Sequence, residues 1–411
     1  METSALVTAN SISTKGNVHI VIGPNGFGKT TYLEGERKRL ENAGKNVFFI
    51  PSEIKLLDEV KDTVDTSQTM EFLLTELLET PEYLSKKKAL YDEADKIIDE
   101  NVGQMNDILD GILRLNGSAR TKDFIAPNSK RTIKNLISIN QDDVKKKMGS
   151  GQRMHLLLEL ASNSSRDYIF LDEPEKYSHP SLLNITASLI NNLIAKGKQV
   201  YLATHSPKLL SMIDFDYSDL KIINDSSHSL KSIPFDDAVM RAASYFNVGA
   251  LPDKFKRYYT DGDTLKKSIS RRQNRQFIEA LFSKHVYLCE GANDELLINA
   301  ALRQFGGYFD DYCIFKAWGK SNLPVFAELF RALNIDVICL FDVDDESKPF
   351  HREANNAIRS VMPADKLVEL NPNLEKEVGF KGEKSDALAL MDHLEANSLS
   401  EKFNLSALWN S

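Results

Sequence analysis

The sequence has few cysteines and no long apolar run, and both absences narrow the classes of protein that it can encode. Its three cysteines, Cys289, Cys313 and Cys339, form no C-x-x-C pair, so neither a disulfide framework nor a zinc site is indicated. We expect them to be buried apolar side chains of a reduced, cytoplasmic protein. No apolar segment is long enough to span a membrane, and residues 1–16 lack the apolar core of a signal peptide. No membrane partner is therefore expected.

The chain also lacks an excess of positive charge. It has 51 Lys and Arg against 59 Asp and Glu in 411 residues, a net charge of −8. Residues 284–411 hold 13 basic and 21 acidic side chains, so all of the excess acidity lies there. Such a concentration is compatible with clustered metal ligands. The length predicts two domains.

The segment from residue 18 to residue 33, VHIVIGPNGFGKTTYL, joins a β-branched apolar run to a glycine-rich loop and a helix-permissive run. The loop has the spacing G-x-x-x-x-G-K-[ST]. Its glycines let successive N–H groups surround an anion, and a following helix N-terminus adds positive potential. Lys29 is expected to reach the β- and γ-phosphates of a nucleotide, and Thr30 to hold Mg²⁺. The expected nucleotide-binding residues are Gly23, Pro24, Asn25, Gly26, Gly28, Lys29, Thr30 and Thr31.

Two later apolar strands end in side chains suited to the same nucleotide. The stretch YIFLDEP at 168–174 places Asp172 and Glu173 after a strand, and VYLATHSP at 200–207 places His205 after another. Open α/β sheets bind ligands at the carboxyl ends of their strands. Asp172 is therefore expected to hold Mg²⁺, Glu173 to activate the attacking water, and His205 to contact the γ-phosphate.

Helical segments lie around these strands. Ser150, Gly151 and Gln152 form a turn ahead of a strongly helical run, and such a turn can bind phosphate. Residues 69–116 are polar with Leu and Ile pairs at helical spacing, which predicts an inserted helical arm that packs on itself or on a partner. The basic cluster at 266–275 is interpreted as a solvated helix face, with a contact to a nucleic-acid backbone as the alternative.

The last third restarts an α/β pattern, with strands expected at 285–289, 312–315 and 337–341 and a helix expected at 320–333. Glu290 follows the first strand, and Asp342 and Asp344 follow the third. In a parallel sheet these strand ends share one edge, so the three carboxylates should converge. Converging carboxylates repel unless a cation joins them, and all-oxygen ligands suit Mg²⁺ or Mn²⁺.

The first group of motifs resembles a known set. GPNGFGKT, GSGQR, FLDEP and ATHSP look like the Walker A, signature, Walker B and switch-histidine motifs of ABC-type ATPases, especially the soluble branch with the overcoming-lysogenization-defect (OLD) family. The resemblance implies ATP as the cofactor and a homodimer or higher homo-oligomer formed through the ATPase domain. It also implies that Ser150 and Gly151 of one subunit contact the nucleotide held by Lys29 of another.

The last third resembles a TOPRIM domain across roughly residues 284–395. The matching pieces are Glu290-Gly291-Ala-Asn-Asp294 and the Asp-Val-Asp at 342–344. OLD-type members add an Asn-Leu-Glu, matched here by Glu375, and a late lysine, matched by Lys384. The resemblance implies metal ligation by Glu290, Asp294, Asp342, Asp344 and Glu375, and two-metal phosphodiester cleavage helped by Lys384.

The sequence thus predicts an OLD-type protein with an ABC-like ATPase domain at 1–225, a connector at 226–283 and a TOPRIM domain at 284–411. Its expected function is ATP-gated, metal-dependent cleavage of DNA, or of a structured RNA such as tRNA, in anti-phage defence. An alternative from another class is an ATPase sensor or scaffold that assembles an oligomer and holds or activates a separate effector protein. A primase- or topoisomerase-like activity is a third reading, but no tyrosine or zinc-ribbon motif supports it.

Overall fold

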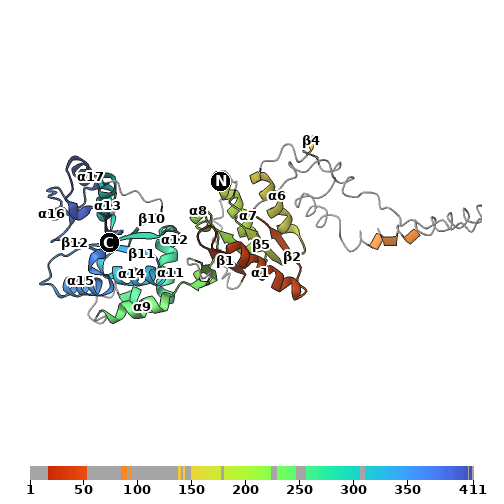
Figure 1. The fold of residues 1–411 in the computed structure, drawn as a ribbon, viewed down its shortest axis with the longest axis horizontal. Coiled ribbons are helices and arrows are strands. Elements are labelled where there is room, and N and C mark those ends of the chain that lie inside the picture. The colour runs from red at the N-terminus through yellow and green to blue at the C-terminus, as the bar shows by residue number, and fades with distance from the viewer. Residues whose placement is uncertain are drawn as a thin grey trace, which may run out of the picture. The chain divides into compact units, whose positions relative to one another are not determined.

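The computed structural model describes two compact units, and many of their helices and strands are labelled in Figure 1. One unit contains the described parts of Met1–Gly44 and Gln199–Ser411, and the other those of Lys45–Lys198. The described residues are 17–52, 85–86, 88–89, 92–93, 138–139, 142–143, 150–176, 180–223, 229–246, 256–305, 311–405 and 407–409. Both units are mixed α/β with mainly parallel strand pairing, so the prediction of an α/β chain with parallel sheets is confirmed.

The amino-terminal sheet of the first unit has the strand order β6-β1-β7-β8. Its strands are β1 (Val18–Ile22), β6 (Gln199–Thr204), β7 (Leu220–Ile222) and β8 (Lys231–Ser232). Strand β1 pairs in parallel with β6 and β7, and four of its five side chains are buried. A β-branched run suits such a strand, because helices or loops cover both faces of a parallel sheet. Helix α1 (Lys29–Asn42) follows β1, and the short helix α8 (Pro207–Leu210) and a 3-10 helix at Tyr217–Asp219 lie between β6 and β7.

The carboxy-terminal sheet of the same unit is fully parallel, with the order β10-β9-β11-β12. Its strands are β9 (His285–Cys289), β10 (Tyr312–Lys316), β11 (Asp336–Asp342) and β12 (Leu367–Leu370). Its helices are α13 (Ala292–Phe305), α14 (Leu323–Ala332), α15 (Pro349–Val361), α16 (Leu374–Glu377) and α17 (Ala387–Ala396), with 3-10 helices at Lys320–Asn322, Ala364–Lys366, Glu401–Phe403 and Ala407–Trp409. All three expected strands are present.

The helix expected at 320–333 starts later than predicted. Lys320–Asn322 is a separate 3-10 helix, and α14 begins at Leu323 with a proline in its first turn. Proline fits the first turn because the N–H that it lacks has no partner inside the helix there. The expectation of one continuous helix was therefore wrong at its first three residues, and Lys320 begins a 3-10 turn in the connection between β10 and α14.

The segment expected as a connector contributes helices to the carboxy-terminal core. These are α9 (Phe235–Ser244), α11 (Gly262–Arg272) and α12 (Asn274–Leu281), with a 3-10 helix at Arg257–Tyr259. Phe277 of α12 packs edge-on against Phe315 of β10 and at a tilt against Phe330 of α14, with ring centroids 6.4 Å and 5.9 Å away. The side chains of all three are fully buried, so residues 274–281 complete the core of the carboxy-terminal sheet.

Helix α12 also covers the edge strand β10. The side-chain amide of Gln273 donates to the carbonyl of Lys316 at 2.7 Å, and that of Gln276 donates to the carbonyl of Ile314 at 2.8 Å. The edge carbonyls are thus satisfied by side chains where a further strand would otherwise pair.

The second unit holds the strand pair β2 (Val47–Ile50) and β5 (Tyr168–Asp172), which are parallel, and the helices α6 (Ser150–Asn163) and α7 (Leu183–Ala195). Two-residue strands β3 (Ser138–Ile139) and β4 (Asp142–Asp143) pair antiparallel. The helical arm predicted at 69–116 lies outside the described residues, apart from helical pieces at 85–86, 88–89 and 92–93.

One expectation from the composition, that the cysteines are buried, is met. The three cysteines are free and buried, and burial raises the pKa of the Cys313 thiol to about 12. Among the helices that the structure describes, none is both long and apolar enough to cross a membrane.

We predict that Phe315→Ala strongly destabilises the carboxy-terminal core. The ring is fully buried and lies 4.7 Å from Phe326 and 5.1 Å from Phe330, centroid to centroid. Its removal leaves a cavity that should lower the free energy of unfolding by about 3–5 kcal/mol, measured by urea denaturation. Met240→Ala, at a side chain that is 65% exposed, should change that energy by less than about 0.5 kcal/mol. Equal losses in both variants would contradict the assignment of this core.

Candidate functional site

The glycine-rich loop forms a cradle at the carboxyl end of β1. Gly23, Gly26 and Gly28 all have positive φ angles, of 155°, 84° and 92°. A Cβ atom at Gly23 would lie 2.0 Å from the carbonyl oxygen of Ile223, so no larger residue fits there. The buried ammonium of Lys29 donates to the carbonyl of Gly23 at 2.9 Å and to that of Pro24 at 3.2 Å. The lysine is therefore folded back along the loop, where its charge faces any anion that the loop binds.

The N-terminus of α1 opens on this loop. The helix starts at Lys29, its N-cap is Gly28, and no side chain caps it. Its first turn holds no acidic residue, so the positive end of the helix dipole is not offset locally. Thr30 and Thr31 are exposed in this first turn. These features suit a bound phosphate chain.

The other predicted nucleotide residues lie on three strand or helix ends. Ile22 of β1 is in register with Thr204 of β6, so Gly23 and His205 leave neighbouring strands at the same sheet edge. In the second unit, Asp172 is the buried last residue of β5, and Glu173 after it has a φ of 47°. Ser150, Gly151 and Gln152 form the first turn of α6, but their side chains lie outside the described part of the structure.

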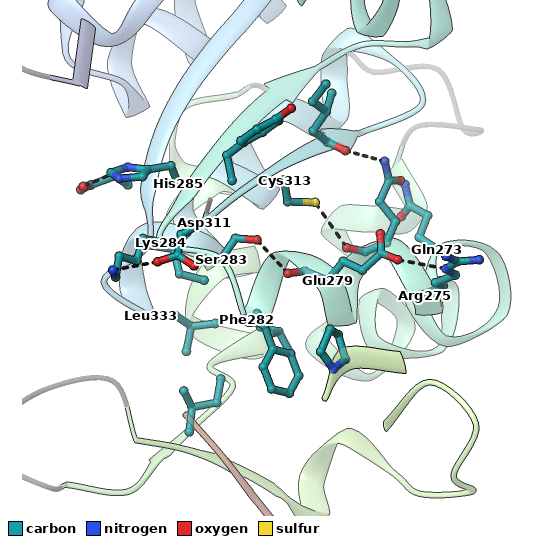
Figure 2. A pocket seen from close by; sticks show the side chains of 18 of the residues that line it. Gln273, Arg275, Glu279, Phe282, Ser283, Lys284, His285, Asp311, Cys313 and Leu333 are labelled. Carbon is teal, nitrogen blue, oxygen red and sulfur yellow. Dashed lines mark hydrogen bonds and ion pairs between the residues drawn. The ribbon is translucent and has the colours of Figure 1, made fainter. Parts of the chain in front are cut away.

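A pocket of about 1410 Å³ includes this cradle in its lining, with Gly23, Pro24, Asn25, Phe27 and His205. Figure 2 shows its wall from α12 and the amino ends of the carboxy-terminal strands. There Arg275 pairs with Glu279 at 2.9 Å, and Lys284 pairs with Asp311 at 2.8 Å. The charged groups of this wall are thus largely matched with one another.

A separate acidic group lies at the carboxyl end of the carboxy-terminal sheet. Parallel pairing of β9 with β11 sets Leu340 opposite Cys289, which brings Glu290 beside the last residues of β11. The backbone N–H of Asp342 donates to Glu290 Oε1 at 3.1 Å. On α13, Asp294 accepts the N–H of Gly291 at 2.9 Å. We call Glu290, Asp294 and Asp342 the acidic trio.

The electrostatics of the acidic trio favour bound positive charge. Burial raises the pKa of Glu290 to about 8; the charge of Lys320 opposes this rise, and the charges of Asp294 and Asp342 add to it. Burial, followed by the charge of Asp342, raises the pKa of Asp294 to about 7. Burial also raises the pKa of Asp342, although Lys384 opposes this. Carboxyl groups that share a buried site resist ionisation together, and a divalent cation would remove that resistance.

Glu375 and Lys384 approach the trio from the segments after β12. The N–H of Leu374, the first residue of α16, donates to Asp342 Oδ1 at 2.8 Å. Lys384 Nζ lies 3.4 Å from Asp342 Oδ2 and 3.8 Å from Glu375 Oε1. Asn293 of α13 donates to the carbonyl of Lys384 at 2.9 Å. The structure thus brings both of these predicted residues to Asp342.

Asp344 is engaged differently from the trio. It has a φ of 57°, and its Oδ2 lies 2.6 Å from Lys320 Nζ and 3.2 Å from His351 Nδ1. Its charge still adds to the raised pKa of Asp342. Accordingly, no group of three or more acidic, His or Cys side chains in the described residues has its atoms arranged to hold a metal as they stand.

Lys320 and His351 are site residues that the sequence reasoning missed. His351 gives no sequence signal, because it lies within α15 and reaches Asp344 only through the fold. Lys320 does give a sequence signal. It follows β10, so it is expected at the same edge of the sheet as Glu290 and Asp342, which follow neighbouring strands. It was overlooked because a helix was expected to begin at residue 320.

The residues present fit a divalent cation of the Mg²⁺ or Mn²⁺ type. Every candidate ligand is a carboxylate, and hard cations prefer oxygen. Glu375 Oε1 is buried and accepts no hydrogen bond from the described residues, and its ion pair with Lys384 is long, at 3.8 Å, so a cation could take this oxygen in place of the lysine. Glu290, Asp294, Asp342 and Glu375 would hold such an ion, with Asp344 next to them.

We predict a pH dependence of stability that is specific to Glu290. A carboxyl whose pKa is higher in the folded state favours folding at low pH, and this contribution disappears as the pH rises from about 4.5 to about 8. In EDTA, Glu290→Gln should therefore gain stability relative to the wild type across that interval, by on the order of a few kcal/mol. Urea titrations at several pH values measure this. Glu383→Gln, at an exposed side chain, should show a constant difference, and a constant difference for Glu290→Gln would contradict the burial argument.

Comparison with known proteins matches part of the carboxy-terminal sheet to a domain family. The domain family described as "Overcoming lysogenization defect protein-like, TOPRIM domain" matches residues 281–344. Old nuclease of Escherichia phage P2 is 25% identical over 186 residues, which cover 44% of this chain and 28% of the phage protein. An uncharacterized protein of Methanocaldococcus jannaschii is 34% identical over 70 residues, 16% of this chain and 59% of that protein.

These alignments cover less than two thirds of the length of either relative. Among solved structures, the complex of archaeal ribosomal stalk protein aP1 with ribosome recycling factor aABCE1 matches 50% of this chain and 36% of that chain, with 17% identity and a TM-score of 0.27. The domain match includes Glu290, Asp294, Asp342 and Asp344, four of the acidic residues described above. The domain match identifies residues 281–344 as a TOPRIM domain of the OLD-like type, and the chain is similar to Old nuclease over part of its length.

Proposed function

We propose that this protein is an OLD-type, metal-dependent nuclease whose cleavage of nucleic-acid phosphodiesters is controlled by ATP, and that it acts in anti-phage defence. The observation that carries the proposal is the approach of Glu290 to Asp342, whose N–H donates to the glutamate at 3.1 Å. Asp294, Glu375 and Lys384 lie around that contact. Similarity to a phage nuclease supports phosphodiester cleavage as the reaction.

The acidic trio and Glu375 hold the divalent cations in this proposal. When bound, Mg²⁺ or Mn²⁺ supplies water activation and neutralises charge on the scissile phosphate. Lys384 is 66% exposed at its side chain and lies 3.4 Å from Asp342 Oδ2, so its ammonium can reach a phosphate oxygen and stabilise the leaving oxygen. The backbone N–H groups of Asp342 and Leu374 fix the orientation of Glu290 and Asp342 before substrate arrives.

The glycine-rich loop binds the triphosphate of ATP in the same proposal. Lys29 and the first turn of α1 contact the phosphates, and Thr30 with Asp172 holds Mg²⁺. Glu173 activates water and His205 contacts the γ-phosphate. Two or more copies assemble through the ATPase domain, with Ser150 and Gly151 of one copy at the nucleotide of another. Support for this half comes from the positive-φ glycines and the folded-back lysine.

A test of the nuclease half uses single substitutions in the trio. Glu290→Ala or Asp342→Ala should abolish cleavage of plasmid DNA, by about 10³-fold or more, while ATP turnover persists. Asp345→Ala is a matched control, because the hydrogen bonds that the structure gives this exposed carboxylate all come from Ser347. This variant should cleave DNA like the wild type. The target is identified by measuring cleavage of duplex DNA, single-stranded DNA and tRNA. Each substrate is tested with Mg²⁺ or Mn²⁺ and with ATP, an analogue or no nucleotide. Normal cleavage by Glu290→Ala would refute the metal site.

A test of the ATPase half uses the cradle. Lys29→Ala should lose nucleotide binding by about 100-fold, because the buried ammonium at the loop carbonyls is removed. Glu173→Gln should bind ATP normally and hydrolyse it slowly, so that bound ATP accumulates. Lys38→Ala, at an exposed side chain of α1, should bind like the wild type. Unchanged ATP affinity in Lys29→Ala, measured by calorimetry, would count against the cradle.

The same experiments distinguish the alternative scaffold function from the proposed nuclease function. It predicts nucleotide-dependent assembly and a stoichiometric partner with no cleavage of any substrate in the panel. The trio variants would then leave every measured activity unchanged.

A further inference from the structure

Lys320 is a buried lysine within the acidic edge, with 4% of its surface exposed. It lies in the loop that joins β10 to α14. The N–H of Gly319 donates to the backbone carbonyl of Glu290 at 3.1 Å. This loop is therefore bonded directly to the residue that follows β9. A lysine is almost never buried unless its charge is compensated, and here the compensation comes from carboxylates assigned to the nuclease site.

The loop that carries Lys320 is held on several sides. The side-chain amide of Asn322 donates to the carbonyl of Ala317 at 2.8 Å. The buried hydroxyl of Tyr259 donates to the carbonyl of Ser321 at 2.5 Å. Lys320 Nζ is therefore positioned by a fixed backbone, and its place at the site does not depend on its ion pair alone.

The partner of Lys320 is Asp344. The ammonium lies 2.6 Å from Asp344 Oδ2 and 3.4 Å from the carbonyl of Val343. His351 Nδ1 lies 3.2 Å from the same Oδ2 atom. The Asp342 carboxylate has different partners, the N–H of Leu374 and the ammonium of Lys384. The two aspartates of the Asp-Val-Asp motif are thus stabilised by separate positive groups.

A cation that binds at Asp344 must share this carboxylate with the ammonium. The two positive charges would lie within a few ångströms of each other in a partly buried site, where repulsion is weakly screened. At the acidic trio the contacting ammonium is that of Lys384, 3.4 Å from Asp342 Oδ2, and its side chain is 66% exposed, so it can turn into solvent when a cation binds. The Lys320 side chain is 4% exposed and has no such freedom. The two halves of the acidic edge should therefore differ in cation affinity.

We propose that Lys320 is a positioning residue that acts as an internal counter-cation: by holding Asp344 it weakens binding of the second divalent cation until a substrate phosphate adds negative charge. This inference rests on the proposed nuclease function and specifies how that site is regulated. A first cation binds at the trio without substrate. The second is retained only when nucleic acid is present, which limits metal-dependent hydrolysis to the occupied site.

The rival explanation is that the Lys320–Asp344 pair only supports the fold. The two explanations predict opposite changes in metal affinity. Removing a purely structural pair loosens the site and weakens cation binding. Removing a competing positive charge strengthens it.

The experiment is Mn²⁺ titration of the full-length protein without nucleic acid, at about pH 8.5 to limit proton competition. Calorimetry or electron paramagnetic resonance counts bound ions. Lys320→Met should bind the weaker Mn²⁺ about tenfold more tightly than the wild type, and Mn²⁺ should raise its melting temperature further. Lys320→Arg, which keeps the charge, should resemble the wild type. Lys316→Met is a matched control, because Lys316, the last residue of β10, pairs with Glu295 of α13, and it should leave both affinities unchanged.

Lys320→Gln replaces the methionine variant if the latter does not fold, since glutamine can still donate to Asp344 without carrying charge. Weaker or unchanged binding of the second Mn²⁺ in the charge-removing variant would overturn the proposal and leave the nuclease assignment intact. Failure of the wild type to bind any Mn²⁺ would overturn the metal centre itself and this inference with it.

Discussion

The parallel pairing of β9 with β11 is the constraint on which the acidic edge depends. Because both strands run in the same direction and Leu340 lies opposite Cys289, the residues that follow them emerge side by side. The Asp342 N–H then reaches Glu290 Oε1. A shift of register by one residue would turn the side chains of one strand to the opposite face of the sheet, and the contact would be lost. The buried apolar side chains of β11 fix that register, so the same packing that stabilises the domain also assembles its site.

Several carboxylates are buried close together at this site, and two features of the protein reduce the repulsion between them. The carboxyls of Glu290 and Asp294 hold protons more tightly than usual, so part of the charge is absent near neutral pH. The remaining charge is offset by Lys320 and Lys384, which contact different aspartates. Lys320 is buried and fixed, whereas Lys384 is largely exposed at its side chain. One lysine is suited to setting the resting charge of the site and the other to meeting a ligand.

Much of this organisation could be predicted from the sequence, for reasons that are local. Strand β11 is an apolar run that ends in Asp-Val-Asp, and the rule that parallel strands open on one edge then places Glu290 near Asp342. The glycine pattern of the loop after β1 likewise encodes positive φ angles that only glycine adopts easily. By contrast, the role of the helices at 235–281 depends on Phe277 meeting Phe315 and Phe330. Such long-range packing leaves no periodic signal. The pairing of Asp344 with His351 is hidden for the same reason, since α15 meets the loop only in the folded chain.

Gln273, which directly precedes α12, and Gln276 within α12 both bond to β10, and this affects how copies of this chain can associate. An open parallel sheet ordinarily presents a row of carbonyl and N–H groups along its outermost strand, and a second chain can extend the sheet there. In this protein Gln273 and Gln276 already take the carbonyls of Lys316 and Ile314. Sheet extension would first have to detach a helix whose Phe277 is fully enclosed. Self-association by continuous β-structure is thus disfavoured along this border, and any assembly must join copies through other surfaces.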